Sequence, residues 1–328
     1  MNKFTTLLLS AVLTAVLFLS AGCQRKDLLE PHDHYNLFIN AKFDSLALTQ
    51  LLSHKSDGYT TPGEPRYTSY ILYEKNSQKV AYRGDFRGLR GGVYVQEGVY
   101  DLLVYTSDFN EYDANFYRNL GNRETAETHT RQTPIDMGGR SDVKEVYMVE
   151  PDPTFSVLHE DIAVFQGEED NEIEVEFVQK SFKYYLTIKA RGLQNIHTAT
   201  MFISGMYTSA FLAHDGHIMN EAGMQTVNMD IIRTKPTEAE EYGKGELYGE
   251  FWSFGPNQRE DILNSIKLEF INGDVITMKL KDLTSQIKTL TKGGEIIVEE
   301  ELEIKGPAGG FQPGVGDWDN STDVDIIL

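Results

Sequence analysis

Two short runs contain the side-chain types that bind metal ions. His32 and His34 stand in a His-x-His spacing, but a zinc site needs three or four ligands and nothing nearby supplies the rest. A run near the C-terminus offers the oxygen ligands that calcium prefers: Asp317, Asp319, Asn320, Asp323 and Asp325. This run lacks the central glycine and closing glutamate of an EF-hand. We interpret both runs as solvated, expect no metal or cofactor, and keep calcium binding at the second run as an alternative.

Paired carboxylates are another source of chemistry, because two of them can hydrolyse a glycosidic bond. Four glutamates lie on or beside one expected strand: Glu299, Glu300, Glu301 and Glu303. Sequence neighbours on a strand point to opposite faces, so Glu299 and Glu300 cannot act as a pair. The chain also lacks the common nucleophile, zinc and phosphate-loop motifs. We therefore expect no catalytic residues and interpret the glutamates as an exposed charged face or as charges that protect an edge strand.

The single cysteine, Cys23, follows an apolar run near the N-terminus. Lys3 gives a positive start, and residues 7–19 form 13 mostly apolar residues, fewer than the roughly 20 that span a bilayer as a helix. Together with the small residues before Cys23, this pattern is typical of a signal peptide that is removed. Since the cysteine stands directly after the cut, the pattern resembles a bacterial lipobox, although Ser20 occupies the position where leucine is usual.

This interpretation assigns residues 1–22 to a signal peptide and residues 23–33 to a polar tether, with Cys23 as the lipidation site. Each buried acyl CH2 contributes ~0.8 kcal/mol, so palmitate-type chains hold a protein to a bilayer durably. Gln24, rather than Asp, follows the cysteine, which resembles sorting to the outer membrane. We expect a lipoprotein that is anchored to the cell outer membrane and exposed at the surface.

Charge and composition limit the remaining possibilities. The formal net charge is −20, and it becomes −21 once residues 1–22, which contain Lys3 and no acid, are removed. Such a surface repels phosphates, so we expect no nucleic-acid partner. A hydrophobic content of 40% with 11% aromatic residues is enough to build cores. The length favours two domains of about 100–200 residues each.

Period-two alternation of apolar and polar residues predicts many strands. In the first, Tyr35, Leu37, Ile39, Ala41 and Phe43 share one face. Further strands are expected at residues 67–74, 79–83, 92–95, 99–105, 143–149 and 161–165. The run at residues 88–92 is interpreted as a flexible turn. Residues 119–140 are polar, and we expect them to form a long excursion outside the core.

The second half has the same pattern after an acidic run at residues 167–171. Alternating strands are expected at residues 172–177, 182–189, 227–231, 247–252, 266–270, 275–280, 296–304 and 324–328. Asn272-Gly273 predicts a type I′ hairpin turn, and residues 281–290 a brief helix. The fold class is therefore all-β, with two tandem antiparallel β-sandwich domains at residues 34–166 and 170–328.

Aromatic side chains raise the alternative of a surface glycan-binding lipoprotein. The chain has 17 Tyr, 17 Phe and 2 Trp, most of them at strand positions that favour a core. Trp252 and Trp318 are the candidates for carbohydrate platforms. A hydrolase, which would need convergent carboxylates in a cleft, is a third and less favoured alternative.

The C-terminal segment contains a pattern of spaced residues: Gly309, Gly310, Phe311, Pro313, Val315 and Trp318, followed by Val324 and Ile326. This pattern resembles the closing segment of Bacteroidales surface lipoproteins that are similar to fimbrillins and fimbrial anchor proteins of the type V pilus class. The lipobox, the first alternating strand and the run from Gly98 to Asp101 also match. Ala308 and the stretch at residues 119–140 depart from the family pattern.

This resemblance implies two transthyretin-like β-sandwich domains and assembly by strand exchange, with other pilus subunits and a glycan or host receptor as partners. Cleavage after an arginine (Arg66, Arg83, Arg87 or Arg90) would remove the strand at residues 35–43. An anchor subunit would keep its lipid. The strand-exchange candidates are Val324, Asp325, Ile326, Ile327 and Leu328, reached through a Gly/Pro-rich linker at residues 306–316. The alternative is that this tail pairs within its own domain.

Overall fold

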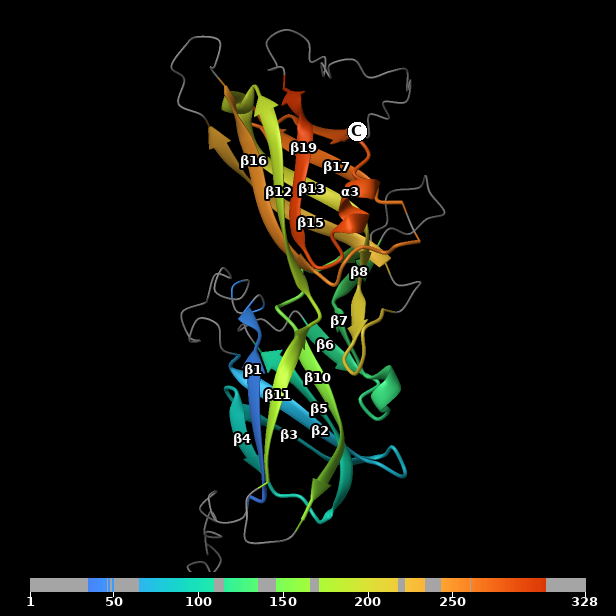
Figure 1. The fold of residues 1–328 in the computed structure, drawn as a ribbon. Coiled ribbons are helices and arrows are strands. Elements are labelled where there is room, and N and C mark those ends of the chain that lie inside the picture. Colours follow the sequence, from blue (N-terminus) through green and yellow to red (C-terminus); the bar gives the residue numbers. More distant parts are fainter. Residues whose placement is uncertain are drawn as a thin grey trace, which may run out of the picture.

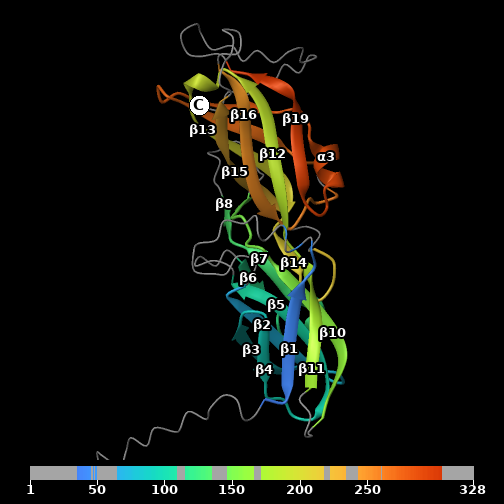
Figure 2. The same cartoon turned by 60° about the vertical axis from the view of Figure 1, so that its left-hand side comes forward.

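The computed structural model describes residues 35–45, 47, 49, 65–108, 115–134, 146–165, 171–217, 222–233, 243–259 and 261–304. Strands make up most of these residues, which confirms the all-β prediction. Two large sheets lie at opposite ends of an elongated molecule, with a small sheet between them (Figure 1). The same arrangement is visible after rotation (Figure 2).

The first sheet has seven strands and curls around its own core. Its order is β3 (Val80–Arg87), β2 (Tyr67–Glu74), β5 (Gly98–Asp108), β10 (Phe155–Val164), β11 (Asn171–Gln179), β1 (Leu37–Phe43) and β4 (Arg90–Val93). The alternation predicted for the first strand is confirmed, because Leu37, Ile39 and Ala41 are buried in this core. The predicted flexible turn at residues 88–92 is wrong in part, since Arg90–Val93 pairs with β1 as a strand.

The second sheet has nine strands, of which seven form one path. Their order is β18 (Val275–Lys279), β17 (Asn264–Phe270), β13 (Ile196–Tyr207), β15 (Ala222–Arg233), β16 (Lys244–Ser253), β12 (Phe182–Arg191) and β19 (Gly294–Glu303). The short strands β8 (Gln132–Pro134) and β9 (Val146–Met148) join this sheet beside β15. The predicted brief helix is confirmed as α3 (Thr284–Thr289), and a one-turn helix η2 (Leu193–Asn195) precedes β13.

The hairpin between β17 and β18 forms as predicted, but its turn is not type I′. Gly273 has a φ of 88°, whereas Asn272 is not among the described residues with a positive φ. The Gly273 N–H donates to the Phe270 carbonyl at 2.9 Å, and the Phe270 N–H donates to the Asp274 carbonyl at 2.8 Å. This pattern is a three-residue loop that ends in a left-handed glycine, so one more residue enters the turn than the sequence suggested.

The two halves of the chain interlock rather than follow one another. Strand β11, which the sequence analysis assigned to the second half, pairs in parallel with β1 in the first sheet. In the other direction, β9 from the first half pairs with β15 of the second sheet. The small sheet is shared, because β14 (Ser209–Phe211) pairs with β7 (Glu127–Thr130), which pairs with β6 (Asn115–Arg118).

The stretch at residues 119–140 was expected to lie outside the core, and its described part contradicts this. Ala126, Glu127, Thr128 and Thr130 are each at most 1% exposed. They follow a one-turn helix, η1 (Arg123–Thr125). Leu212 from the second half packs into the same cluster, and its N–H donates to the Ala126 carbonyl at 2.9 Å. The larger buried apolar residues of this cluster come from β2, β5 and Leu212, so this stretch needs few of its own.

Candidate strand-exchange site

Strand β1 occupies a position in which both of its edges are paired. Residues 37–43 pair in parallel with residues 171–177 of β11, and residues 37–40 pair antiparallel with residues 90–93 of β4. A strand with neighbours on both sides leaves two unpaired edges when it is removed, and unpaired edges are templates for another strand. The site is therefore the slot between β4 and β11.

The inward face of β1 provides the apolar contacts of this slot. Leu37 and Ile39 are fully buried and Ala41 is 3% exposed. At the end of the strand, the ring of Phe43 lies 4.8 Å from that of Phe155 in an edge-to-face arrangement. Full burial of a Leu or Ile side chain contributes about 1.5–3 kcal/mol. The strand is thus held by side-chain burial as well as by its two hydrogen-bond ladders.

The outward face of β1 carries exposed ion pairs. Lys42 lies 3.5 Å from Glu174 of β11, and Arg90 of β4 lies 3.3 Å from Glu172 of β11. Exposed pairs of this kind contribute roughly 0–1 kcal/mol. These ion pairs therefore help to select the register of β1 but add little to the free energy that holds it in the slot.

The side chain of Asn36 fixes the start of β1. Its Nδ2 donates to the Val95 carbonyl at 2.7 Å, and its Oδ1 accepts from the Val95 N–H at 2.9 Å. An amide side chain can satisfy a backbone donor and acceptor together, as a neighbouring strand would. Asn36 thereby extends the β1–β4 pairing by one position.

Two glycines in β4 allow aromatic rings to lie against its backbone. A Cβ added at Gly91 would lie 2.3 Å from the Phe86 ring, and one added at Gly92 would lie 2.7 Å from the Tyr35 ring. These distances are shorter than side-chain contacts permit. The glycines that the sequence analysis took for turn residues are therefore required by ring packing in the wall of the slot.

Several predicted site residues lie outside the described part of the chain. These are the lipidation residue Cys23, the strand-exchange residues Val324, Asp325, Ile326, Ile327 and Leu328, the aromatic residue Trp318, and the residues considered for metal binding at 32–34 and 317–325. Trp252 is described, and its predicted role as an exposed carbohydrate platform is wrong, because the residue is 1% exposed. It lies on β16 with its side chain enclosed.

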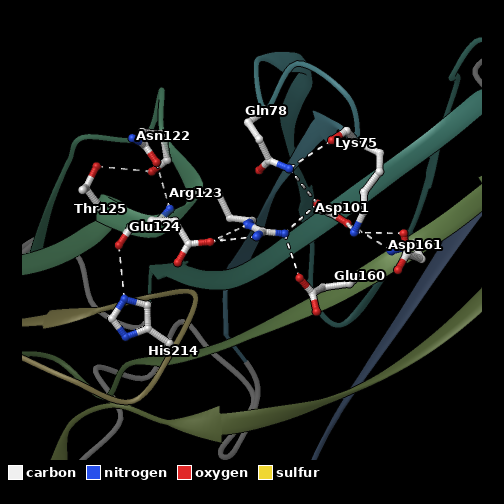
Figure 3. A network of polar contacts seen from close by, with 10 residues as sticks. All are labelled: Lys75, Gln78, Asp101, Asn122, Arg123, Glu124, Thr125, Glu160, Asp161 and His214. Carbon is white, nitrogen blue, oxygen red and sulfur yellow. Dashed lines mark hydrogen bonds and ion pairs between the residues drawn. The ribbon is translucent and has the colours of Figure 1, made fainter.

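A buried charge cluster surrounds Asp101 of β5, in the same sheet as β1 (Figure 3). The side chain of Asp101 in β5 is 0% exposed, and its Oδ2 accepts from Arg123 Nη1 at 2.6 Å. Its Oδ1 accepts from the Asp161 backbone N–H at 3.0 Å and from Lys75 Nζ at 3.3 Å. Arg123 also contacts Glu160 at 2.8 Å. One carboxylate thus joins β5, the β2–β3 turn, the bulge in β10 and the helix η1.

The surroundings of Asp101 set its charge state. Burial by itself raises the pKa of this carboxyl group, but the Asp161 N–H and the Lys75 and Arg123 cations outweigh burial and lower the pKa. In turn, the hydrogen bond from Lys75 to Asp161 raises the pKa of the Lys75 amine. Asp161 has a φ of 60°, which an L-residue adopts only at a cost. The ionised Asp101 compensates that cost by accepting the Asp161 N–H.

The sequence analysis did not assign a role to this cluster. Asp101 was noticed only as the last residue of a familiar run, and Lys75, Arg123 and Glu160 are 22 to 59 positions away from it along the chain. The sequence signal that could have revealed the cluster was Asp101 itself, an acidic residue within an otherwise apolar strand. The cluster also connects the halves, because His214 Nε2 lies 3.1 Å from the Glu124 carbonyl.

Neither a metal centre nor a membrane-crossing helix occurs among the described residues. Within those ranges, His, Cys, Asp and Glu side chains do not gather in threes at metal-binding distances. Likewise, the helices within them are too short or too polar to cross a bilayer.

Comparison with known proteins adds a family to this geometry. Residues 22–228 match the model of the family described as "Domain of unknown function (DUF5119)". The chain belongs to the DUF5119 family. The matched residues include β1, β4 and β11, and hence the whole slot. No curated protein matches the sequence of this DUF5119 protein.

Several solved structures are similar to this chain. One is a candidate adhesin from Bacteroides ovatus, with 18% identity and a TM-score of 0.50 over 87% of this chain and 98% of that chain. A second, also a candidate adhesin, comes from Bacteroides thetaiotaomicron, with 8% identity and a TM-score of 0.46 over 82% and 92%. The fimbrial anchor protein Mfa2 from Porphyromonas gingivalis has 11% identity and a TM-score of 0.42 over 83% and 91%. The first match shows a common fold for the DUF5119 protein and the Bacteroides ovatus structure.

Proposed function

We propose that this chain is a lipid-anchored outer-membrane protein of the fimbrial accessory or anchor type, which acts in pilus assembly and cell adhesion by β-strand exchange. The proposal includes two sandwich domains, removal of residues 1–22 and acylation of Cys23. The observation that carries it is the position of β1 between β4 and β11, paired on both edges. The fold shared with a candidate adhesin supports a surface role. The buried position of Trp252 removes the described support for glycan binding.

The C-terminal segment has the pattern that the slot requires of an incoming strand. Its residues 324–328 read Val-Asp-Ile-Ile-Leu, with apolar side chains at every second position. Placed in reverse, Leu328, Ile326 and Val324 occupy the positions of Leu37, Ile39 and Ala41. A reversed strand is antiparallel to β11, where β1 is parallel, and antiparallel ladders are slightly more stable per residue. Exchange with the tail of another copy therefore replaces the apolar contacts of β1. It also makes the ladder with β11, the longer of the two, antiparallel.

Release of β1 requires a cut between β1 and β2. Of the four candidate arginines, Arg66 lies just before β2 and is exposed, whereas Arg83 and Arg87 lie within β3 and Arg90 lies within β4. Cleavage after Arg66 separates β1 without breaking a strand of the sheet. In the anchor role the cut does not occur, so β1 stays in its slot and the lipid keeps the chain at the base of the fibre. Strand exchange then uses residues 324–328 of this chain in the slot of a neighbouring subunit.

The test uses the full mature chain with a specific protease site inserted at residues 60–64. After cleavage, a synthetic peptide of residues 317–328 is added, and release of the β1 fragment is followed by size exclusion and mass spectrometry. We expect the peptide to accelerate release and to remain bound. A control peptide with Val324→Asp and Ile326→Asp should do neither. Lack of peptide binding once β1 has left would contradict strand exchange at this slot.

A further inference from the structure

Strand β19 forms one edge of the second sheet. It pairs in parallel with β12 from Gly294 to Val298 and again at Leu302 and Glu303, with a bulge between the two stretches, and no other strand of the described residues pairs with its outer side. Figure 2 shows β19 at the margin of the sheet with α3 beside it. An edge of this length presents backbone donors and acceptors that a further strand can pair with.

A side chain occupies one position of this outer edge. With the Gln286 amide in the orientation that satisfies both of its ends, its nitrogen donates to the Ile297 carbonyl at 3.3 Å and its oxygen accepts from the Ile297 N–H at 3.2 Å. Asn36 makes the same two-bond contact with Val95 at the start of β1, where a strand pair begins. Gln286 therefore takes the place of a neighbouring strand at Ile297 only. It makes no such pair of hydrogen bonds with the other described residues of β19.

The charges along β19 indicate what kind of strand fits there. Glu299, Glu301 and Glu303 are exposed, and the side chains of Val298 and Leu302 are buried. Of the three glutamates, Glu301 pairs with Arg191 of β12 at 3.2 Å, and the described residues offer no basic partner to Glu299 or Glu303. On β11 two of the exposed glutamates are neutralised, since Glu174 pairs with Lys42 of β1 and Glu172 pairs with Arg90 of β4.

We propose that the outer edge of β19 is a docking site for an extended peptide in which Lys or Arg alternates with apolar residues. The incoming backbone pairs with β19 and displaces Gln286 from Ile297. Its basic side chains lie beside Glu299 and Glu303, and its apolar side chains extend the core next to Val298 and Leu302. This site is separate from the β1 slot, and the inference stands whether or not β1 is exchanged.

The experiment measures binding of two synthetic nine-residue peptides to the full mature chain by calorimetry. One alternates lysine and valine, and the other alternates glutamate and valine. We expect only the first to bind and to slow hydrogen–deuterium exchange in residues 294–303. Gln286→Ala should tighten binding about tenfold, because two neutral hydrogen bonds no longer compete with the peptide.

A charge-matched pair of variants separates this site from general attraction to an acidic protein. Glu299→Lys should weaken binding roughly three- to fivefold, whereas Glu176→Lys, an equal charge change at an exposed residue of β11, should leave it unchanged. Equal effects of the two variants would overturn the proposal. So would slow exchange, in Gln286→Ala before any peptide is added, at the amides of β19 that point away from β12, such as that of Ile297, since the edge would then already be covered by this chain. Self-association of Gln286→Ala without peptide binding would show that Gln286 only protects the edge, and would also overturn it.

Discussion

Replacement of Asp101 by Asn tests whether the buried charge cluster stabilises the fold. The isosteric amide keeps an oxygen for the Asp161 N–H but loses its charge towards Arg123, whose nitrogen lies 2.6 Å from the carboxylate. At ~4 Å between charge centres, this attraction amounts to about 4 kcal/mol in a medium of intermediate dielectric. The neutral amide recovers part of the desolvation cost but leaves Arg123, which is 14% exposed, without its closest buried partner. Loss of one member of such a pair costs about 3 kcal/mol in the free energy of unfolding.

This value corresponds to a fall in melting temperature of about 5 °C for a chain of this size, measurable by differential scanning calorimetry. The matched control is Glu124→Gln, which also removes a carboxylate from Arg123 but from a side chain that is 62% exposed. We expect less than about 1 kcal/mol for that change.

The pH dependence gives the same experiment a second readout. The folded-state pKa of Asp101 is lowered, so its contribution is complete above the unfolded-state pKa of about 4 and is lost as the pH falls through the folded-state value. The difference between wild type and Asp101→Asn should therefore shrink in acid. A variant as stable as the wild type at pH 7 would refute the reasoning, because desolvation would then outweigh the ion pairs.

Three further predictions concern other parts of the chain. Glu150 is exposed as a residue, but its carboxyl accepts a hydrogen bond from the Trp252 backbone N–H at 2.8 Å, and burial of that carboxyl raises its pKa to about 7. Stability should therefore fall as the pH rises from about 4.5 to 7. Glu150→Gln should melt higher than wild type at pH 8 and equally at pH 4. Gly91→Ala should lower the free energy of unfolding by about 1–3 kcal/mol in a denaturant titration, because the added Cβ meets the Phe86 ring. Gly88→Ala is the control for space, since its Cβ meets no atom within 4 Å and only the positive φ of Gly88 adds a cost. Cys23→Ser should abolish acylation, and intact-mass analysis of wild type without added acyl mass would contradict the lipid anchor.

The sequence by itself determined the all-β fold class and which face of an individual strand is buried. The alternation at residues 35–43 predicted which side chains of β1 are buried, and α3 was expected within residues 281–290. These features are local, because side chains on a strand alternate with period two whatever the strand pairs with. The prediction that Glu299 and Glu300 do not form a catalytic pair rests on the same geometry.

Only the tertiary structure decided which strands are neighbours. Parallel pairing of β1 with β11 joins residues more than 130 positions apart, and nothing in either segment encodes that partner. The Asp101 cluster and the contact of Gln286 with Ile297 likewise depend on how distant segments meet. Burial of Trp252 was missed for the same reason, since an aromatic residue on a strand faces core or solvent according to what covers the sheet. Local pattern sets the face of a residue, and packing between distant segments sets what that face contacts.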